Sequence, residues 1–326
     1  MDGVKRSFFA LLTIVAVLFS SCDKVENPFP PKVNTDLDTT IYAGNWSDYV
    51  ANEWPDFSSI PNENLERNVL IEDFTGHNCS FCPAAGEIAH AIHVNNPLRV
   101  FIASIHASNT ISGTSSFQDI NTAQGYTIDF KNANGLELGK YFGYTLTNSG
   151  FFGNPAGTIS RTNDGGEYFP ASGSWSTKTN AVLASPLKVA IKAKLNYFEL
   201  PKHGFFLHTE VEKLDNTLAN ELAMVVYIME DSLVGPQNVT NVFTPDYVHR
   251  DIMRGTIDGQ TWGRTLTSTM LNSGKYYLDY SFILPNQLAQ AGVTTTHNAE
   301  NMHVLIYVYD KVTLEIYQVI KQKIIG

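Results

Sequence analysis

The chain of 326 residues is long enough for about two domains of ordinary size. Hydrophobic residues make up 43% of it, which is enough apolar surface for packed cores and excludes a disordered protein. Asp and Glu together number 32 against 22 Lys and Arg, and the net charge of -10 argues against a nucleic acid partner, because phosphate backbones repel acidic surfaces.

The first segment of the chain has the pattern of an export signal. Lys5 and Arg6 precede an uncharged apolar run, 8–19, that is shorter than the ~20 residues a membrane-spanning helix needs. The sequence LFSSC, which ends at Cys22, resembles a bacterial lipobox. This resemblance implies that residues 1–21 are a lipoprotein signal peptide and that Cys22 becomes lipid-modified. An ordinary signal peptide followed by an incidental cysteine is the alternative.

Residues 22–36 are predicted to form a tether. Charged residues directly follow Cys22, and prolines, which fix φ and favour an extended chain, come next. The charges resemble the surface-export signals of Bacteroidetes lipoproteins, and a plain solvated linker explains them equally well. Residues 37–67 contain Trp46 and Trp54 and are too aromatic for a linker, so we expect this N-terminal extension to pack on a folded domain.

A strand, a CxxC motif, a helix and a second strand follow one another along the next part of the chain. Residues 69–74 are apolar enough for a buried strand, 83–94 have helical spacing, and 99–106 form another apolar run. Cys79 and Cys82 therefore lie at the N-terminus of a helix, where free amide N–H groups favour a thiolate.

A disulfide between Cys79 and Cys82 would close a very small loop and add little stability, so its natural use is redox chemistry. In such chemistry Cys79 is the nucleophile that forms a mixed disulfide, and Cys82 resolves it. A zinc site is the alternative, although structural zinc usually needs four ligands and there is no second CxxC. Its further ligands would be the nearby histidines His77, His90, His93 and His106. We expect neither a metal nor another cofactor.

These residues resemble the active site of the thioredoxin fold. Asp73 precedes Cys79 at the position of that fold's buried carboxylate, whose implied role is to take the proton from Cys82. A surface charge is the alternative interpretation of Asp73. Asn154 and Pro155 precede a strand-like run and resemble the cis-proline loop. The resemblance implies a cis peptide bond there, close to the CxxC motif, with backbone groups that bind an extended partner chain.

Other polar residues near these motifs are interpreted without a catalytic role. Glu72 is taken as a strand-edge or capping carboxylate, and His77 as a turn residue or a group that tunes Cys79 electrostatically. His249 and Asp251 suggest part of a hydrolase triad, but the chain has no GxSxG motif, so we interpret their segment as a packed loop.

The thioredoxin-like domain is expected to span residues 68–185. Residues 107–150 look like an insertion that contains a helix at 135–144, and 174–184 would be the closing helix. From there, residues 186–326 show short runs rich in Val, Ile, Tyr and Phe without helices between them, which favours an antiparallel β-sandwich. Its strands are expected at 187–198, 203–214, 221–231, 276–284, 302–310 and 313–324.

A longer signature points to a narrower family. The sequence IEDFTG before Cys79, the pair Cys82-Pro83, and the segment DYVHRDIMRG at 246–255 resemble the twenty-eight-kilodalton outer-membrane lipoprotein family of Bacteroidetes. The resemblance covers most of residues 65–326. It implies an α/β thioredoxin-like domain with a helical insertion, followed by an all-β antiparallel sandwich of immunoglobulin-like type. It also implies an outer-membrane location, on either the periplasmic or the surface face.

We therefore expect a cell-envelope lipoprotein that acts as a thiol-disulfide oxidoreductase on thiols or disulfides of exported proteins. Its catalytic residues would be Cys79, Cys82 and Asp73. Asn154 and Pro155 would bind the substrate, and lipid on the N-terminal cysteine would attach the chain to the membrane. The alternative is an outer-membrane binding or adhesion protein with a non-catalytic thioredoxin-like scaffold. The sequence predicts neither the direction of electron flow nor the oligomeric state.

Overall fold

The computed structural model describes residues 37–146, 149–199, 203–284 and 299–325. The signal peptide, the tether and the lipid-modified Cys22, which we predicted from the sequence, lie outside the described residues. Within the described part of the chain, no helix is both long enough and apolar enough to cross a membrane.

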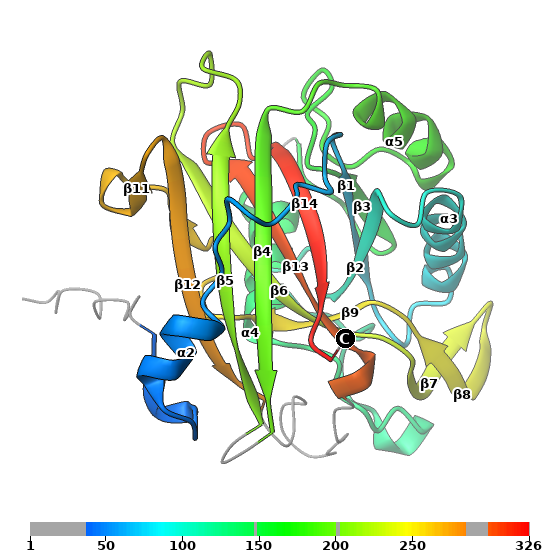
Figure 1. Ribbon diagram of the computed structural model, residues 1–326. Coiled ribbons are helices and arrows are strands. Elements are labelled where there is room, and N and C mark those ends of the chain that lie inside the picture. Colours follow the sequence, from blue (N-terminus) through cyan, green and yellow to red (C-terminus); the bar gives the residue numbers. More distant parts are fainter. Residues whose placement is uncertain (1–36, 147–148, 200–202, 285–298, 326) are drawn as a thin grey trace, which may run out of the picture. The chain divides into compact units, whose positions relative to one another are not determined.

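The strand, helix and strand predicted around the CxxC motif are present. β1 (Val69–Thr75) is followed by α3 (Cys82–Asn95), and β2 (Val100–His106) then pairs with β1 in parallel. β3 (Ala156–Ile159) pairs with the other edge of β1 in the antiparallel direction. α3 and α5 (Trp175–Leu183) pack on one face of these strands (Figure 1). This arrangement is the one expected of a thioredoxin-like domain.

Residues 107–150 form an insertion between β2 and β3. Its first regular element is η2 (Thr122–Gln124). α4 (Ala133–Lys140) and the π-helical turn η3 (Tyr141–Thr145) lie where the sequence predicted a helix. The side chain of Asn132 accepts a hydrogen bond from the N–H of Gly135 and so caps α4. A short 3-10 turn, η4 (Ser172–Ser174), leads into α5.

The described residues of the second half of the chain form strands and turns. Its strands form a four-stranded antiparallel sheet in the order β11-β12-β5-β4, a two-stranded sheet of β7 and β8, and part of an eight-stranded sheet. The strands are β4 (Val189–Phe198), β5 (Gly204–Lys213), β6 (Leu222–Glu230), β7 (Leu233–Val239), β8 (Val242–His249), β9 (Ile252–Thr256), β10 (Arg264–Thr265), β11 (Leu271–Asn272), β12 (Lys275–Ile283), β13 (Met302–Asp310) and β14 (Ile316–Lys323). Two 3-10 turns lie between them, η5 (Ser268–Met270) and η6 (Ala299–Asn301).

The eight-stranded sheet joins the two halves of the chain. Its order is β14-β13-β6-β9-β2-β1-β3, with β10 beside β6. The boundary predicted at Ser185-Pro186 separates α5 from β4, yet the sheet runs across it, because β9 pairs with β2. The sheet also curves: the N–H of Ile316, at the start of β14, donates to the carbonyl of Ser160, just after β3. The described residues therefore form one compact unit.

β6 and β13 are buried on both faces, because they lie between two cores. On one face their side chains pack against the four-stranded sheet, as in Met224 and Val226. On the other face they pack against the thioredoxin-like half, as in Val225 and Tyr227. A strand that is covered on both sides needs a nearly continuous apolar sequence, which explains the runs LAMVVYIM and VLIYVY.

The N-terminal extension packs on the outer face of the four-stranded sheet. It contains η1 (Thr39–Ile41) and α2 (Trp46–Asn52). Tyr49 contacts Phe206 of β5, and its hydroxyl lies 2.8 Å from Nε2 of His208. Figure 1 shows α2 beside this sheet. The aromatic residues that made a linker unlikely in the sequence are thus used in packing.

A buried ion pair links the two halves across the first core. Glu72 on β1 is fully buried, so its interpretation as a strand-edge or capping carboxylate is wrong. Arg161, just after β3, donates from Nε to Oε2 of Glu72 at 2.7 Å and from Nη2 to Oε1 at 2.6 Å. The hydroxyl of Tyr227 donates to the same carboxylate, and Arg161 also donates to the hydroxyl of Tyr307. The pair therefore ties β1 to β6 and β13.

Removing one partner of this pair should destabilise the protein strongly. In Glu72→Ala the guanidinium of Arg161 stays buried without its counter-charge, and we expect a loss of about 3 to 5 kcal/mol in the free energy of unfolding. Glu221→Ala is the matched control, because Glu221 forms an exposed pair with Lys311, and its loss should be below about 1 kcal/mol. Urea unfolding of both variants measures the difference. Equal losses would mean that the buried pair is not a structural link.

Candidate functional site

The sheet face that meets α3 changes from apolar to polar along the strands. At its start this face carries Val69, Ile71, Val100 and Ile102, which pack against α3 and α5. Towards the carboxyl ends of β1 and β2 the same face carries Asp73 opposite Ser104, and Thr75 opposite His106. The polar side chains of Asp73, Thr75, Ser104 and His106 line one small cavity of about 60 Å³, together with Cys82. A polar site thus lies at the end of an otherwise apolar layer.

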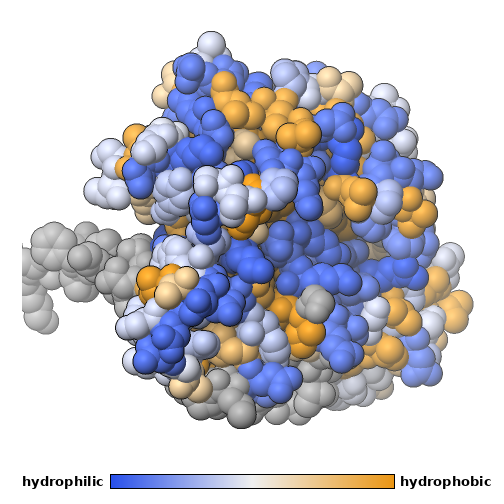
Figure 2. All heavy atoms as spheres, viewed as in Figure 1, coloured by the Kyte–Doolittle hydropathy of each residue, from blue (hydrophilic) through white to orange (hydrophobic). Residues whose placement is uncertain are grey.

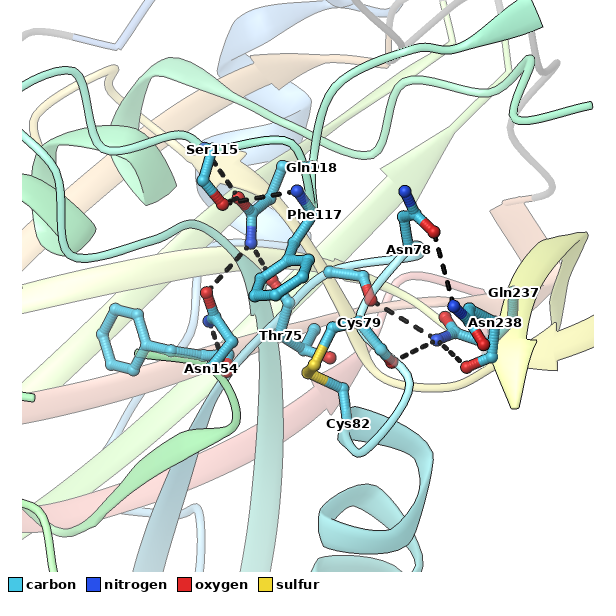
Figure 3. Close-up of a disulfide and its surroundings, with 12 residues drawn as sticks. Thr75, Asn78, Cys79, Cys82, Ser115, Phe117, Gln118, Asn154, Gln237 and Asn238 are labelled. Carbon is cyan, nitrogen blue, oxygen red and sulfur yellow. Dashed lines mark hydrogen bonds between the residues drawn. A yellow bond between two sulfur atoms is a disulfide. The ribbon is translucent and has the colours of Figure 1, made fainter. Parts of the chain in front are cut away.

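The two cysteines of the CxxC motif form a disulfide at this place (Figure 3). Cys82 is the first residue of α3, with Pro83 in its first turn, and Cys79 lies in the turn after β1. Both cysteines are only 2% exposed. Between them, Phe81 is 68% exposed and presents an apolar ring to solvent beside the disulfide.

A loop of the insertion covers one side of the disulfide turn. The N–H of Asn78 donates to the carbonyl of Phe117 at 3.0 Å, and Nε2 of Gln118 donates to the carbonyl of Thr75 at 2.8 Å. A Cβ atom on Gly76 would lie 2.6 Å from the carbonyl oxygen of Phe117, which is too close for any larger residue. The glycine of the motif is therefore required by the close approach of this loop (Figure 3).

The loop that contains Pro155 is fixed to the end of β1. The Asn154–Pro155 peptide bond is cis, as the resemblance implied. The side-chain amide of Asn154 donates to the carbonyls of Phe74 and Ala107, both at 2.8 Å, and its oxygen accepts from Gln118. The side chain of Asn154 is thus used within the protein. The role of Asn154 and Pro155 in substrate binding stays a prediction.

Asp73 is a buried carboxyl group, which rejects its interpretation as a surface charge. It is 2% exposed, and its Oδ1 has no hydrogen-bond partner among the described residues. Burial raises the pKa of Asp73 to about 7, because the charged form loses its hydration. Its Oδ2 faces α3, since a Cβ atom on Gly86 would lie 3.8 Å from it. Asp73 can therefore hold or release a proton near neutral pH.

Two buried histidines line the same cavity as Asp73. His106 ends β2, and His249 ends β8, so the segment interpreted as a packed loop is the end of a strand. Burial lowers the pKa of His249 to about 4, and it lowers the pKa of His106 well below its usual value. Both rings are therefore uncharged at neutral pH. His77 is a third buried histidine, and it lies 3.0 Å from the carbonyl of Asp119 and stacks on Tyr126.

The zinc alternative finds no support in this arrangement. Among the residues that the structure describes, no group of three or more His, Cys, Asp or Glu side chains is placed to hold a metal ion. His90 and His93 both lie on α3, and His90 lines the same cavity as His106.

A hairpin from the second half of the chain covers the other side of the disulfide turn. Strands β7 and β8 form this hairpin. The N–H of Asn238 donates to the carbonyl of His77 at 2.7 Å, and that of Thr240 donates to the carbonyl of Ser80 at 3.1 Å. The side chain of Gln237 donates to the carbonyl of Cys79 at 3.2 Å (Figure 3). No strands were predicted from the sequence in this region.

Comparison with solved structures supports a thioredoxin-like domain in this chain. HBP35 of Porphyromonas gingivalis superposes with a TM-score of 0.57 at 18% sequence identity, over 79% of this chain and 76% of that chain. At this identity the likeness concerns the fold alone. No family model and no curated protein matches the sequence.

Two further structures superpose more loosely, with TM-scores too low to support an argument about fold or function. A domain of the outer membrane lipoprotein Omp28 from Porphyromonas gingivalis is 22% identical, with 42% of this chain and 88% of that chain covered and a TM-score of 0.27. A protein from Agrobacterium tumefaciens is 12% identical, with 78% and 94% covered and a TM-score of 0.42.

The burial of Asp73 predicts a pH-dependent effect of Asp73→Asn on stability. A pKa near 7 in the folded protein, against 3.8 for the ordinary carboxyl group, means that the folded state holds a proton that the unfolded state loses as pH rises between these values. This contribution is fully favourable below pH 4 and falls by about 1.4 kcal/mol per pH unit up to pH 7. The asparagine variant should therefore gain stability relative to the original protein over that range.

Urea unfolding of the oxidised proteins at pH 5 and pH 7 measures this difference. Asp246→Asn, which changes an exposed carboxylate, serves as the control. If the free energies of unfolding of Asp73→Asn and the original protein differ by the same amount at both pH values, the raised pKa is contradicted.

Proposed function

We propose that this protein is a cell-envelope thiol-disulfide oxidoreductase that acts on thiols or disulfides of exported proteins. The observation that carries the proposal is the meeting of a Cys79–Cys82 disulfide at a helix N-terminus with the buried carboxyl group of Asp73, whose Oδ1 has no hydrogen-bond partner among the described residues. A disulfide that serves only as a staple gains nothing from a buried group that titrates near pH 7. The cis-proline loop beside the end of β1 is the third part of this set.

The reaction begins at Cys79. A partner thiolate forms a bond with Sγ of Cys79, the bond between Cys79 and Cys82 breaks, and its electron pair leaves on Sγ of Cys82. Protonated Asp73 supplies the proton that this leaving thiolate takes up. In the opposite direction, the Asp73 carboxylate takes the proton from the Cys82 thiol as Cys82 attacks the mixed disulfide. A pKa near 7 suits both directions.

The partner would lie along the cis-proline loop. In that position an extended chain can pair with backbone groups next to Pro155, as in other strand-addition complexes. The exposed ring of Phe81, in the turn between the two cysteines, offers an apolar contact. These features favour an extended, partly apolar segment of an exported protein as the substrate.

The second half is proposed to be an immunoglobulin-like sandwich. Its two layers are β11-β12-β5-β4 and β14-β13-β6, packed on each other across one core. The sheet order β11-β12-β5-β4 corresponds to strands D, E, B and A of an immunoglobulin constant domain. The order β14-β13-β6 corresponds to its strands G, F and C. The hairpin β7-β8 and strands β9 and β10 would then be additions between C and D.

A binding or adhesion protein with a non-catalytic scaffold is the second candidate. The burial of Cys79 and Cys82 favours this second candidate, because a disulfide that no partner reaches is structural. Insulin reduction by the purified chain in the presence of dithiothreitol separates the candidates. We expect turnover that is lost in Cys79→Ser and lowered about 10- to 100-fold near pH 7 in Asp73→Ala, since general acid-base catalysis contributes about that much or more. Turnover that is equal in Cys79→Ser and the original protein would support the scaffold.

Attachment to the outer membrane through lipid on Cys22 is a separate proposal, supported by the lipobox-like sequence. Cys22→Ala should release a soluble protein into the periplasm or the medium. Fractionation with a salt wash measures this, and protease treatment of whole cells reports which membrane face carries the original protein. A variant that stays in the washed membrane fraction would exclude the lipid on Cys22 as the anchor.

A further inference from the structure

The disulfide is enclosed, although the proposed reaction needs an open approach to it. A thiolate must reach Sγ of Cys79 in line with the bond to Cys82, and both residues are 2% exposed. The covering segments are the insertion loop with Gln118 on one side and the hairpin β7-β8 on the other (Figure 3). One of these covers has to move before any partner reacts.

The insertion loop is fixed both to the end of β1 and to the cis-proline loop. The side chain of Gln118 is buried and donates to the carbonyls of Thr75 and Ala107 and to the side chain of Asn154. Its movement would leave several buried carbonyl groups without donors, at a cost of about 1 to 3 kcal/mol each.

The hairpin, by contrast, is divided into a fixed base and a separate tip. In the base, Leu233 packs on a cluster of Ile128, Phe130 and Ile252. The pairing of the two strands is interrupted between Gly235 and Gln237, where Pro236 and Pro245 lack backbone donors. The tip therefore has its own short ladder, 237–244, beyond a natural hinge.

The tip makes all the hydrogen bonds that hold the hairpin to the disulfide turn among the described residues, through Gln237, Asn238 and Thr240. Its outer face is exposed at Val242, and Phe243 is partly exposed against Tyr126. Figure 1 shows the hairpin projecting from the edge of the molecule, and hydrophobic and hydrophilic atoms lie side by side at that edge in Figure 2. The tip is thus held by its hydrogen bonds to the disulfide turn and by the packing of Phe243 against Tyr126.

We propose that the hairpin tip, residues 237–244, is a lid that hinges at the Pro236 interruption and determines which thiols reach Cys79. The proposal rests on the proposed function, because only a reacting disulfide needs a lid. Gln237 is the positioning residue, since its side-chain amide binds the carbonyls of Cys79 and Gly76. A partner able to displace the tip reacts, and a thiol that cannot do so waits for spontaneous opening.

The kinetics of reduction by dithiothreitol test the lid without a protein substrate. One dithiothreitol thiolate bonds to Sγ of Cys79 and frees Cys82, and the second thiol then closes the dithiothreitol ring and frees Cys79, so the reagent is oxidised by two electrons as the protein disulfide is reduced. If opening precedes reaction, the observed rate stops rising at high dithiothreitol concentration. That plateau is the opening rate.

Variants then locate the motion. Gln237→Ala removes the hydrogen bonds to the carbonyls of Gly76 and Cys79 from the closed state only, so the rate at low dithiothreitol concentration should rise about two- to tenfold. Val242→Thr changes the exposed face of the same tip and should leave the rate unchanged. Glu72→Gln is the control for global unfolding, because it lowers the stability of the whole protein at a position far from the hairpin. An increase in its rate of reduction would show that the disulfide reacts in the unfolded protein. A rate that rises in Glu72→Gln as much as in Gln237→Ala would overturn the lid.

Hydrogen exchange gives an independent measurement. The amides of Asn238 and Thr240, which bond to the disulfide turn, should exchange together and faster in Gln237→Ala, while amides of β6 and β13 stay unchanged. A rate of reduction that stays linear in dithiothreitol and unaltered in Gln237→Ala would show that no lid operates. If these tests show that the lid opens but the protein does not reduce insulin, the proposed function is contradicted and the lid is not.

Discussion

Two neighbouring carboxyl groups on β1 are the constraint on which much of this structure depends. Because successive side chains of a strand point to opposite faces, Glu72 and Asp73 enter different cores. Glu72 meets the guanidinium of Arg161 and the hydroxyl of Tyr227, which compensate its charge. Among the described residues no cation pairs with Asp73, and burial raises its pKa to about 7. One strand thus supplies a structural anion on one face and a proton-holding group on the other.

The local parts of the site could be predicted from the sequence, and the long-range parts could not. The order of strand, CxxC and helix follows from the pattern of short segments, whereas the burial of Asp73 and the cis bond before Pro155 were implied by the resemblance to the thioredoxin fold. The partner of Glu72 is Arg161, and nothing in the spacing between them indicates that a turn after β3 brings the guanidinium into the core. The joining of β9 to β2 is likewise a long-range pairing that periodicity does not encode.

The hairpin was missed for a different physical reason. Its turn consists of Thr240 and Asn241 with positive φ angles of 51° and 65°, a conformation that glycine and asparagine favour and threonine does not. Pro236 and Pro245 also interrupt both strands, and proline argues against a strand in any reading of sequence alone. The alternation of Val, Phe and Tyr in VFTPDYVH was the remaining signal. The two prolines that made the hairpin hard to predict from the sequence also divide it into base and tip.

The docking of the N-terminal extension has a mechanical consequence. The first described residues are fixed to the four-stranded sheet: the N–H of Asp38 donates to the hydroxyl of Ser281, and Tyr49 bonds to His208. The disulfide lies beyond two further cores, at the N-terminus of α3. Tension applied through the preceding chain would therefore be borne by β5 and β12 before it reached the CxxC turn. A pull strong enough to peel off the extension would expose Trp46 and Tyr49 while leaving the geometry around the sulfur atoms unchanged.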